Sequence, residues 1–68
     1  MNQQPKIHLT IREQQVLELL LIRGSSNKQI GRSLGISEST VKLHMSNILK
    51  KYCAKTRTQL MIFARVGV

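Results

Sequence analysis

Several residue types are scarce in this chain of 68 residues, and each shortage excludes a class of protein. Cys53 is the single cysteine, so an internal disulfide is impossible, and no partner residue stands at metal-ligand spacing. We expect its thiol to be half-buried at a helix end and chemically inert. Because tryptophan is absent and only one phenylalanine and one tyrosine occur, the core must be built from aliphatic side chains.

Long apolar runs and catalytic constellations are also missing. No stretch of 18 apolar residues and no signal-peptide pattern occurs, so we expect no membrane segment and a cytoplasmic location. The sequence contains no paired-carboxylate set, no Ser-His-Asp or Cys-His set and no glycine-rich phosphate loop. An enzyme, a cofactor and a bound metal are therefore not expected.

Negative charge is scarce as well. Eleven lysines and arginines face three acidic residues, which gives a formal net charge of +8. Such an excess favours a polyanionic partner. The basic residues are spread along the chain, which argues against insertion into an anionic membrane.

The length allows one small domain. Residues 1–7 include the only proline and lack any periodicity, so we interpret them as a lead-in or linker. Residues 8–68 are expected to form the domain.

Hydrophobic periodicity predicts an all-α fold of four helices, and the first two share a start signal. Thr10 and Glu13 form a capping-box pattern before an apolar run that stops at Gly24. Ser26 and Gln29 repeat the pattern before a helix of about two turns. No strand pattern competes with these assignments.

The last two helices have start signals of their own. Ser37 is expected to cap the third helix, which should run to Tyr52 or the next residue. Thr56 and Gln59 provide another capping box, and the fourth helix should end near Val66.

The third helix has two contrasting faces. Five apolar residues lie within about one third of its circumference and should face the core: Val41, Met45, Ile48, Leu49 and Tyr52. The opposite side carries Ser39, Thr40, Leu43, Ser46, Asn47 and Lys50, with Lys42, His44 and Lys51 on its flanks. This outward side has no carboxylate, although ordinary solvated helices mix acidic and basic residues. Short polar groups with flanking cations are typical of a helix that enters the major groove of DNA.

The connection between the second and third helices supports this interpretation. Gly31 permits close approach of the following segment, and Gly35 permits a sharp turn. Together they predict helix-turn-helix geometry, with an ordinary αα-hairpin of a helical bundle as the alternative.

Four segments in order make the chain resemble the LuxR-type (GerE-like) helix-turn-helix domains of bacterial transcription regulators. They are LTIREQQVLELL, GSSNKQI, SLGISESTVKLHMSNILKKY and TRTQL. The resemblance covers residues 9–64. It implies a four-helix domain whose third helix reads the major groove and whose fourth helix commonly supplies a dimer contact.

The resemblance also implies roles for individual residues. Lys42 would touch DNA bases, and the neighbouring outward residues Leu43 and Ser46 would face bases too. Asn27, Lys28 and Thr40 would meet phosphates. Ser39, Asn47 and Lys50 complete the expected DNA-binding set.

Two departures from the family pattern bear on structure. Gly31 stands where the family usually has Ala, and Tyr52-Cys53-Ala54 replaces the usual Leu-Gly-Val. A non-glycine residue in left-handed conformation would cost about 1 kcal/mol, so we expect the third helix to continue or end irregularly.

A basic cluster and a lone histidine are the remaining polar features of this region. Lys50, Lys51, Lys55 and Arg57 form a basic cluster, of which we expect one or two to neutralise phosphates and the others to be solvated. We expect His44 to pack and hydrogen-bond at the edge of the helix interface.

The fourth helix is apolar all round, so it should bury two faces. We assign Leu60, Phe63 and Ala64 to the core, and Met61, Ile62 and Val66 to a partner subunit. The alternative is that all of them cover a monomeric core. A symmetric homodimer would favour an inverted-repeat operator.

The sequence therefore predicts sequence-specific binding of double-stranded DNA for transcription regulation. The recognition helix would span residues 38–52, and dimerisation would use residues 57–66. The alternative from another class is a protein-interaction module that pairs with a related regulator or docks on RNA polymerase. The cationic flanks of the third helix disfavour it.

Overall fold

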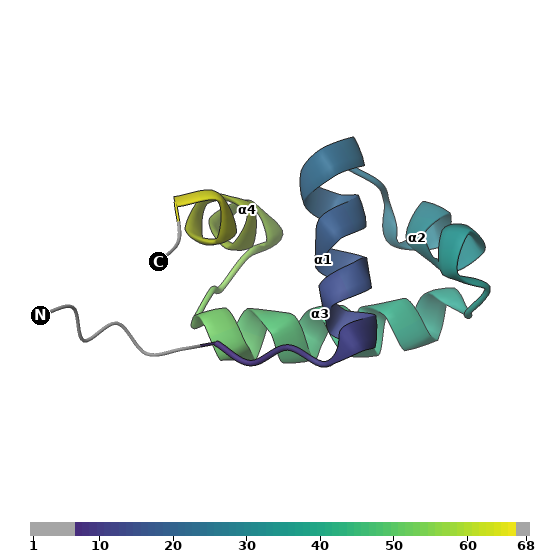
Figure 1. Ribbon diagram of the computed structural model, residues 1–68, viewed down its shortest axis with the longest axis horizontal. Coiled ribbons are helices and arrows are strands. Elements are labelled where there is room, and N and C mark those ends of the chain that lie inside the picture. The colour runs from purple at the N-terminus through teal and green to yellow at the C-terminus, as the bar shows by residue number, and fades with distance from the viewer. Residues whose placement is uncertain (1–6, 67–68) are drawn as a thin grey trace, which may run out of the picture.

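The computed structural model describes residues 7–66, which form four helices and no strand. The helices are α1 (Ile11–Arg23), α2 (Asn27–Leu34), α3 (Glu38–Tyr52) and α4 (Arg57–Val66), as Figure 1 shows. The predicted all-α fold is confirmed. Most of the predicted lead-in lies outside the described residues, as does the end of the chain after α4.

The starts of α1 and α2 are closed by reciprocal hydrogen bonds. Thr10 Oγ1 accepts from the backbone N–H of Glu13 at 3.1 Å, while Glu13 Oε1 accepts from the N–H of Thr10 at 3.0 Å. Ser26 and Gln29 exchange the same pair of bonds at 3.2 and 2.9 Å. Both predicted capping boxes are confirmed, and each satisfies two backbone donors that a helix start leaves free.

The end of α3 is regular, contrary to expectation. Cys53 takes the left-handed conformation itself, with φ 53° and ψ 35°. Its N–H donates to the Lys50 carbonyl at 3.1 Å, and the N–H of Ala54 donates to the Leu49 carbonyl at 2.9 Å. These two bonds form a Schellman motif, which is usually completed by glycine. The Cys53 thiol is exposed, so the prediction of a half-buried thiol was wrong.

The start of α4 differs from its predicted box in one bond. Thr56 Oγ1 accepts from the N–H of Gln59 at 3.1 Å, as expected. The Gln59 side chain, however, accepts from the N–H of Lys55 at 2.8 Å and so reaches one residue further back. The helix ends at Val66, as predicted.

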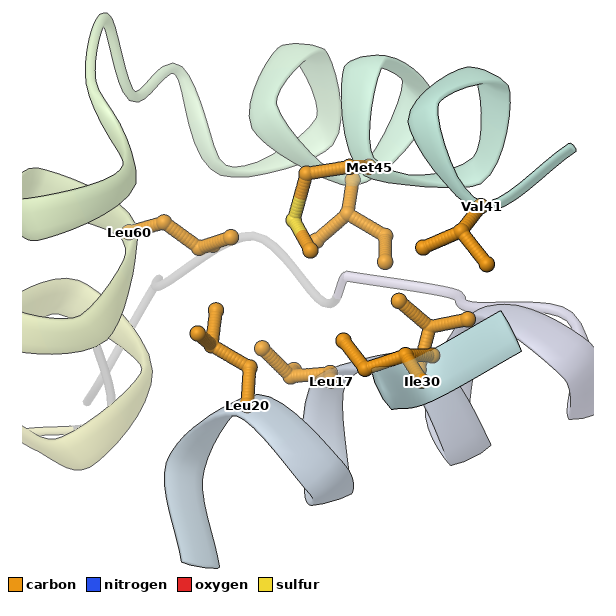
Figure 2. Packing of buried hydrophobic residues seen from close by; sticks show 8 residues of the cluster. Leu17, Leu20, Ile30, Val41, Met45 and Leu60 are labelled. Atoms are coloured by element: carbon orange, nitrogen blue, oxygen red, sulfur yellow. The ribbon is translucent and has the colours of Figure 1, made fainter. Parts of the chain in front are cut away.

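The helices enclose a single aliphatic core. α1 crosses α3, α2 packs near the start of α3, and α4 folds back beside the end of α3 (Figure 1). Side chains from all four helices converge in Figure 2, and the buried cluster comprises Val16, Leu17, Leu20, Ile30, Val41, Met45, Ile48 and Leu60. Three of the five inward residues predicted on α3 are buried: Val41, Met45 and Ile48. Leu49 and Tyr52 are half-buried against the same cluster.

Gly31 allows α2 and α3 to approach closely. It is buried, and a Cβ atom there would lie 2.7 Å from the carbonyl oxygen of Ile36. The N–H of Ile36 donates to the Gly31 carbonyl at 3.0 Å, and Gly35 turns the chain with φ 70°. The tight α2–α3 connection of a helix-turn-helix therefore depends on this absent side chain.

Candidate nucleic-acid interface

The outward side of α3 presents short polar groups and cations to solvent. Five of its predicted DNA-binding side chains are exposed: Ser39, Lys42, Leu43, Ser46 and Lys50. Leu43 is 62% exposed and is one of five large apolar side chains that are exposed among the described residues. Thr40 and Asn47 are half-buried at the edges of this side. Glu38 is the one acidic residue of α3 and lies in its first turn.

Thr40 has a structural role that leaves a donor free. Its N–H donates to Ser37 Oγ at 3.1 Å, and the two hydroxyl oxygens lie 2.8 Å apart. If Ser37 donates its hydroxyl proton across that pair, the proton of Thr40 is available to an outside acceptor. Capping α3 is therefore compatible with a phosphate contact.

Lys51 is not available for an outside partner. Its Nζ lies 2.7 Å from Oε1 of Glu13 and also donates to the backbone carbonyl of His8 at 2.9 Å. Glu13 is buried, and the hydrogen bond from Lys51, together with that from the N–H of Thr10, lowers the pKa of its carboxyl group. This pair fastens the start of α1 to the end of α3.

Arg57 is also engaged within the molecule. It donates through Nη1 to Oδ1 of Asn27 at 2.8 Å and through Nη2 to the carbonyl of Ser25. Within residues 7–66, the side-chain ammonium groups of Lys50 and Lys55 have no such acceptor, and both residues are exposed. The basic cluster therefore divides into two structural cations and two that face solvent.

The start of α2 is a second cationic region. Lys28 is exposed and Asn27 is half-buried, and both lie in the first turn, which has no acidic residue. The positive end of the α2 dipole adds to this charge. These are two of the three residues for which the family resemblance implies phosphate contacts.

His44 is half-buried, in agreement with the expectation that it packs at the edge of the helix interface. The expected hydrogen bond of the His44 side chain is not found among residues 7–66. Nor do those residues bring together three side chains that could hold a metal ion. No helix in the same range is both long enough and apolar enough to cross a lipid bilayer.

The outer side of α4 differs in part from its predicted division. Ile62 is 53% and Val66 64% exposed, so both are available to a partner. Met61, expected at the subunit interface, is half-buried and packs against the core cluster, as does Ala64. Phe63, expected in the core, is half-buried but does not pack on that cluster.

Two contacts of this region join residues that lie far apart in the sequence. One contact joins Lys51 to Glu13, which lie 38 positions apart. The other joins Arg57 to Asn27, which lie 30 positions apart. No helical spacing connects such residues, so the sequence shows the charges but not their partners.

Comparison with known proteins adds a family match. A family model described as bacterial regulatory proteins, luxR family, matches residues 8–64. The chain is 52% identical over 56 residues to the probable csgAB operon transcriptional regulatory protein of Salmonella typhimurium, covering 82% of this chain and 26% of that protein. It is 43% identical over 63 residues to the transcriptional regulatory protein LiaR of Bacillus subtilis, covering 93% of this chain and 29% of LiaR.

A third relative is the response regulator protein VraR of Staphylococcus aureus. It is 46% identical over 56 residues, which are 82% of this chain and 26% of VraR. The chain thus spans about a quarter of the length of these curated relatives.

Proposed function

Because this chain belongs to the luxR family of bacterial regulatory proteins, we propose that it binds double-stranded DNA and regulates transcription. In this proposal α3 lies in the major groove. The observation that carries it is the outward side of α3, where Ser39, Leu43 and Ser46 are exposed together with the cations Lys42 and Lys50. A surface without carboxylates, on a helix held close to α2, suits an anionic duplex.

The outward residues divide by the part of DNA they would reach. Lys42, Leu43 and Ser46 would face base edges, where an ammonium group or a hydroxyl can hydrogen-bond and an apolar group can touch a thymine methyl. Asn27, Lys28, Thr40 and Lys50 would meet phosphates, which fix the register of the protein on the duplex. Ser39 and Asn47 would lie beside these contacts.

The pairing of two subunits through α4 forms part of the proposal. Ile62 and Val66 lie four residues apart and are both exposed, so they form one apolar stripe. Half-buried Met61 would contribute its remaining surface. A two-fold dimer would bind an inverted repeat with half-sites about one turn of DNA apart.

Selection of bound sequences from a random pool of duplex DNA tests base readout. We expect Lys42→Ala or Ser46→Ala to lose the preference at one position, while Lys50→Ala weakens binding uniformly and lowers the salt slope by about 0.9. Arg23→Ala is the matched control, because Arg23 is exposed on α1 and its loss changes the net charge equally. If wild type selects no sequence and binding does not fall with salt, DNA binding is wrong.

Sedimentation on DNA tests the dimer separately. Ile62→Glu should abolish pairing, because two carboxylates would meet at the two-fold axis. Ile11→Glu is the control, since Ile11 is 82% exposed on α1 and lies outside the proposed interface. If wild type and Ile62→Glu are both monomeric even on DNA, the dimer is removed from the proposal and DNA binding stays in place.

A further inference from the structure

Arg57 fastens the start of α4 to the start of α2. Its two terminal nitrogens bind two different acceptors, Oδ1 of Asn27 at 2.8 Å and the backbone carbonyl of Ser25. Ser25 is buried, and its own N–H donates to the Leu19 carbonyl at 3.4 Å. A planar guanidinium held at two points has little freedom to rotate. Arg57 therefore gives Asn27 a fixed neighbour.

The bond to Arg57 determines which end of the Asn27 amide faces outward. A carboxamide has an oxygen that accepts and an NH₂ group that donates, whereas a guanidinium only donates. The atom of Asn27 beside Arg57 must therefore be its oxygen. The NH₂ group is turned away and, within residues 7–66, donates to no other group. Since phosphate oxygens only accept, NH₂ is the end that a DNA-backbone contact requires.

The charge around Asn27 also suits an anion. The ion pair found in residues 7–66 joins Lys51 to Glu13, so no carboxylate there neutralises Arg57 or Lys28. The capping box of α2 uses the N–H groups of Ser26 and Gln29. Within the same range, the N–H groups of the two intervening residues have no acceptor. Arg57 thus contacts the Asn27 amide, Lys28 is the next residue along the chain, and the backbone N–H groups of Asn27 and Lys28 are free at the positive end of the α2 dipole.

We propose that Arg57 is a positioning residue for the phosphate contact of Asn27. It holds the carboxamide with its NH₂ group toward the DNA backbone and adds positive charge beside it. This inference rests on the proposed function of DNA binding. Because Arg57 is the first residue of α4, the same bond links a phosphate contact to the helix proposed for subunit pairing.

A double-mutant cycle on the full chain tests the role, with Asn27→Ala, Arg57→Met and the double variant. The readout is affinity for a short duplex of mixed sequence, because a phosphate contact does not depend on base sequence. In the wild-type background Asn27→Ala should weaken binding about tenfold. In the Arg57→Met background the same change should cost less than about twofold, because the amide is no longer oriented.

Arg65→Met is the matched control. Arg65 lies on the same helix and donates to the Leu21 carbonyl at 3.1 Å, so its loss also removes a cation and an anchor of α4. In that background Asn27→Ala should still weaken binding about tenfold. If Arg57→Met fails to fold, Arg57→Lys is used in its place. Lysine keeps the charge but lacks the planar guanidinium that binds two acceptors at once.

The outcomes separate this inference from the proposed function. An equal loss for Asn27→Ala with and without Arg57 would overturn the positioning role while DNA binding stands. If Asn27→Ala also weakens binding by less than about twofold in the Arg65→Met background, the positioning role is overturned as well. The loss of any anchor of α4 would then reduce the effect of Asn27→Ala. A wild-type chain that does not bind duplex at low salt would overturn the proposed function itself.

Discussion

α4 is held in the molecule by a different kind of contact from that which holds α1, α2 and α3 together. The first three helices share seven buried apolar side chains, five of them fully buried, and a close backbone contact at Gly31. α4 contributes one fully buried residue, Leu60, and two arginines. Arg57 and Arg65, at its two ends, donate to carbonyls of Ser25 and Leu21 respectively.

The difference shows which part of the domain is a rigid body. Interdigitated side chains fix the mutual position of α1, α2 and α3, and so the position of the outward side of α3. α4 relies on Leu60 and a few hydrogen bonds, each of which has a small net worth because water competes for its groups, so α4 is held less firmly. A shift of a helix attached in this way leaves the outward side of α3 in place, but the Arg57 bond transmits the shift to Asn27 at the start of α2.

The largest expected effect is in the buried cluster. Ile48 is fully buried at the centre of α3, so Ile48→Ala should lower the free energy of unfolding by about 3 kcal/mol. Urea titration measures this loss. Leu43→Ala on the exposed side of the same helix should change stability by less than about 0.5 kcal/mol. Similar losses in the two variants would contradict the packing described for α3.

Amide hydrogen exchange in the wild-type chain tests the comparison directly. We expect the α4 amides to open at a free energy about 2 kcal/mol below that of the amides around Ile48 in α3. The reason is that opening α4 exposes one buried side chain rather than seven. Equal opening energies in α3 and α4 would mean that the four helices form one cooperative unit.

The ion pair between Glu13 and Lys51 makes stability depend on pH. Because its hydrogen bonds lower the pKa of Glu13 in the folded state, the unfolded chain binds more protons at acid pH. The pair therefore stabilises the folded state fully above the ordinary carboxyl pKa. This stabilisation is lost as pH falls through the lowered pKa of Glu13 in the folded state. Glu13→Gln keeps the capping-box geometry and should cost about 1.5 kcal/mol at neutral pH.

Unfolding of wild type and Glu13→Gln across the acid range measures that dependence. The difference between the two proteins should shrink as pH falls, because protonated Glu13 loses its charge. Glu18→Gln is the control, as Glu18 is exposed and hydrogen-bonds to Gln14 on the same helix at 3.4 Å. A difference that is constant with pH would show that charge is not what holds α1 to α3.

The smallest expected effect is at the end of α3. Cys53→Gly should raise the free energy of unfolding by about 0.5 kcal/mol, because a left-handed cost of about 1 kcal/mol is removed. The greater freedom of glycine in the unfolded chain offsets about half of that gain. Thermal unfolding measures the change, and Cys53→Ala, which keeps a Cβ atom, should show no gain.

Local sequence signals were sufficient for most of the fold. The caps at Thr10, Ser26 and Ser37 and the inward stripe of α3 depend on residues three or four positions apart, and all were predictable. The close approach at Gly31 followed from the lack of a side chain. The exposure of the outward residues of α3 then followed from the stripe on its other side.

Contacts between distant residues were not predictable in the same way. Lys51 seemed a flanking cation of the outward side because helical geometry alone cannot show that Glu13 lies beside it. Cys53 was expected to disturb the helix end, yet two backbone bonds and the packing of Ala54 on the core hold it in left-handed conformation. On α4 the assignments of Met61 and Phe63 differed because an all-round apolar helix gives no stripe to orient it.

The exposed thiol of Cys53 has a practical consequence. Since the sequence contains no second cysteine, a thiol-reactive fluorophore would attach to the native chain at one known position. That position follows directly on the last residue of α3. The emission of such a dye would report the approach of a nucleic acid or of another subunit while every residue of the proposed contact surfaces stays unaltered.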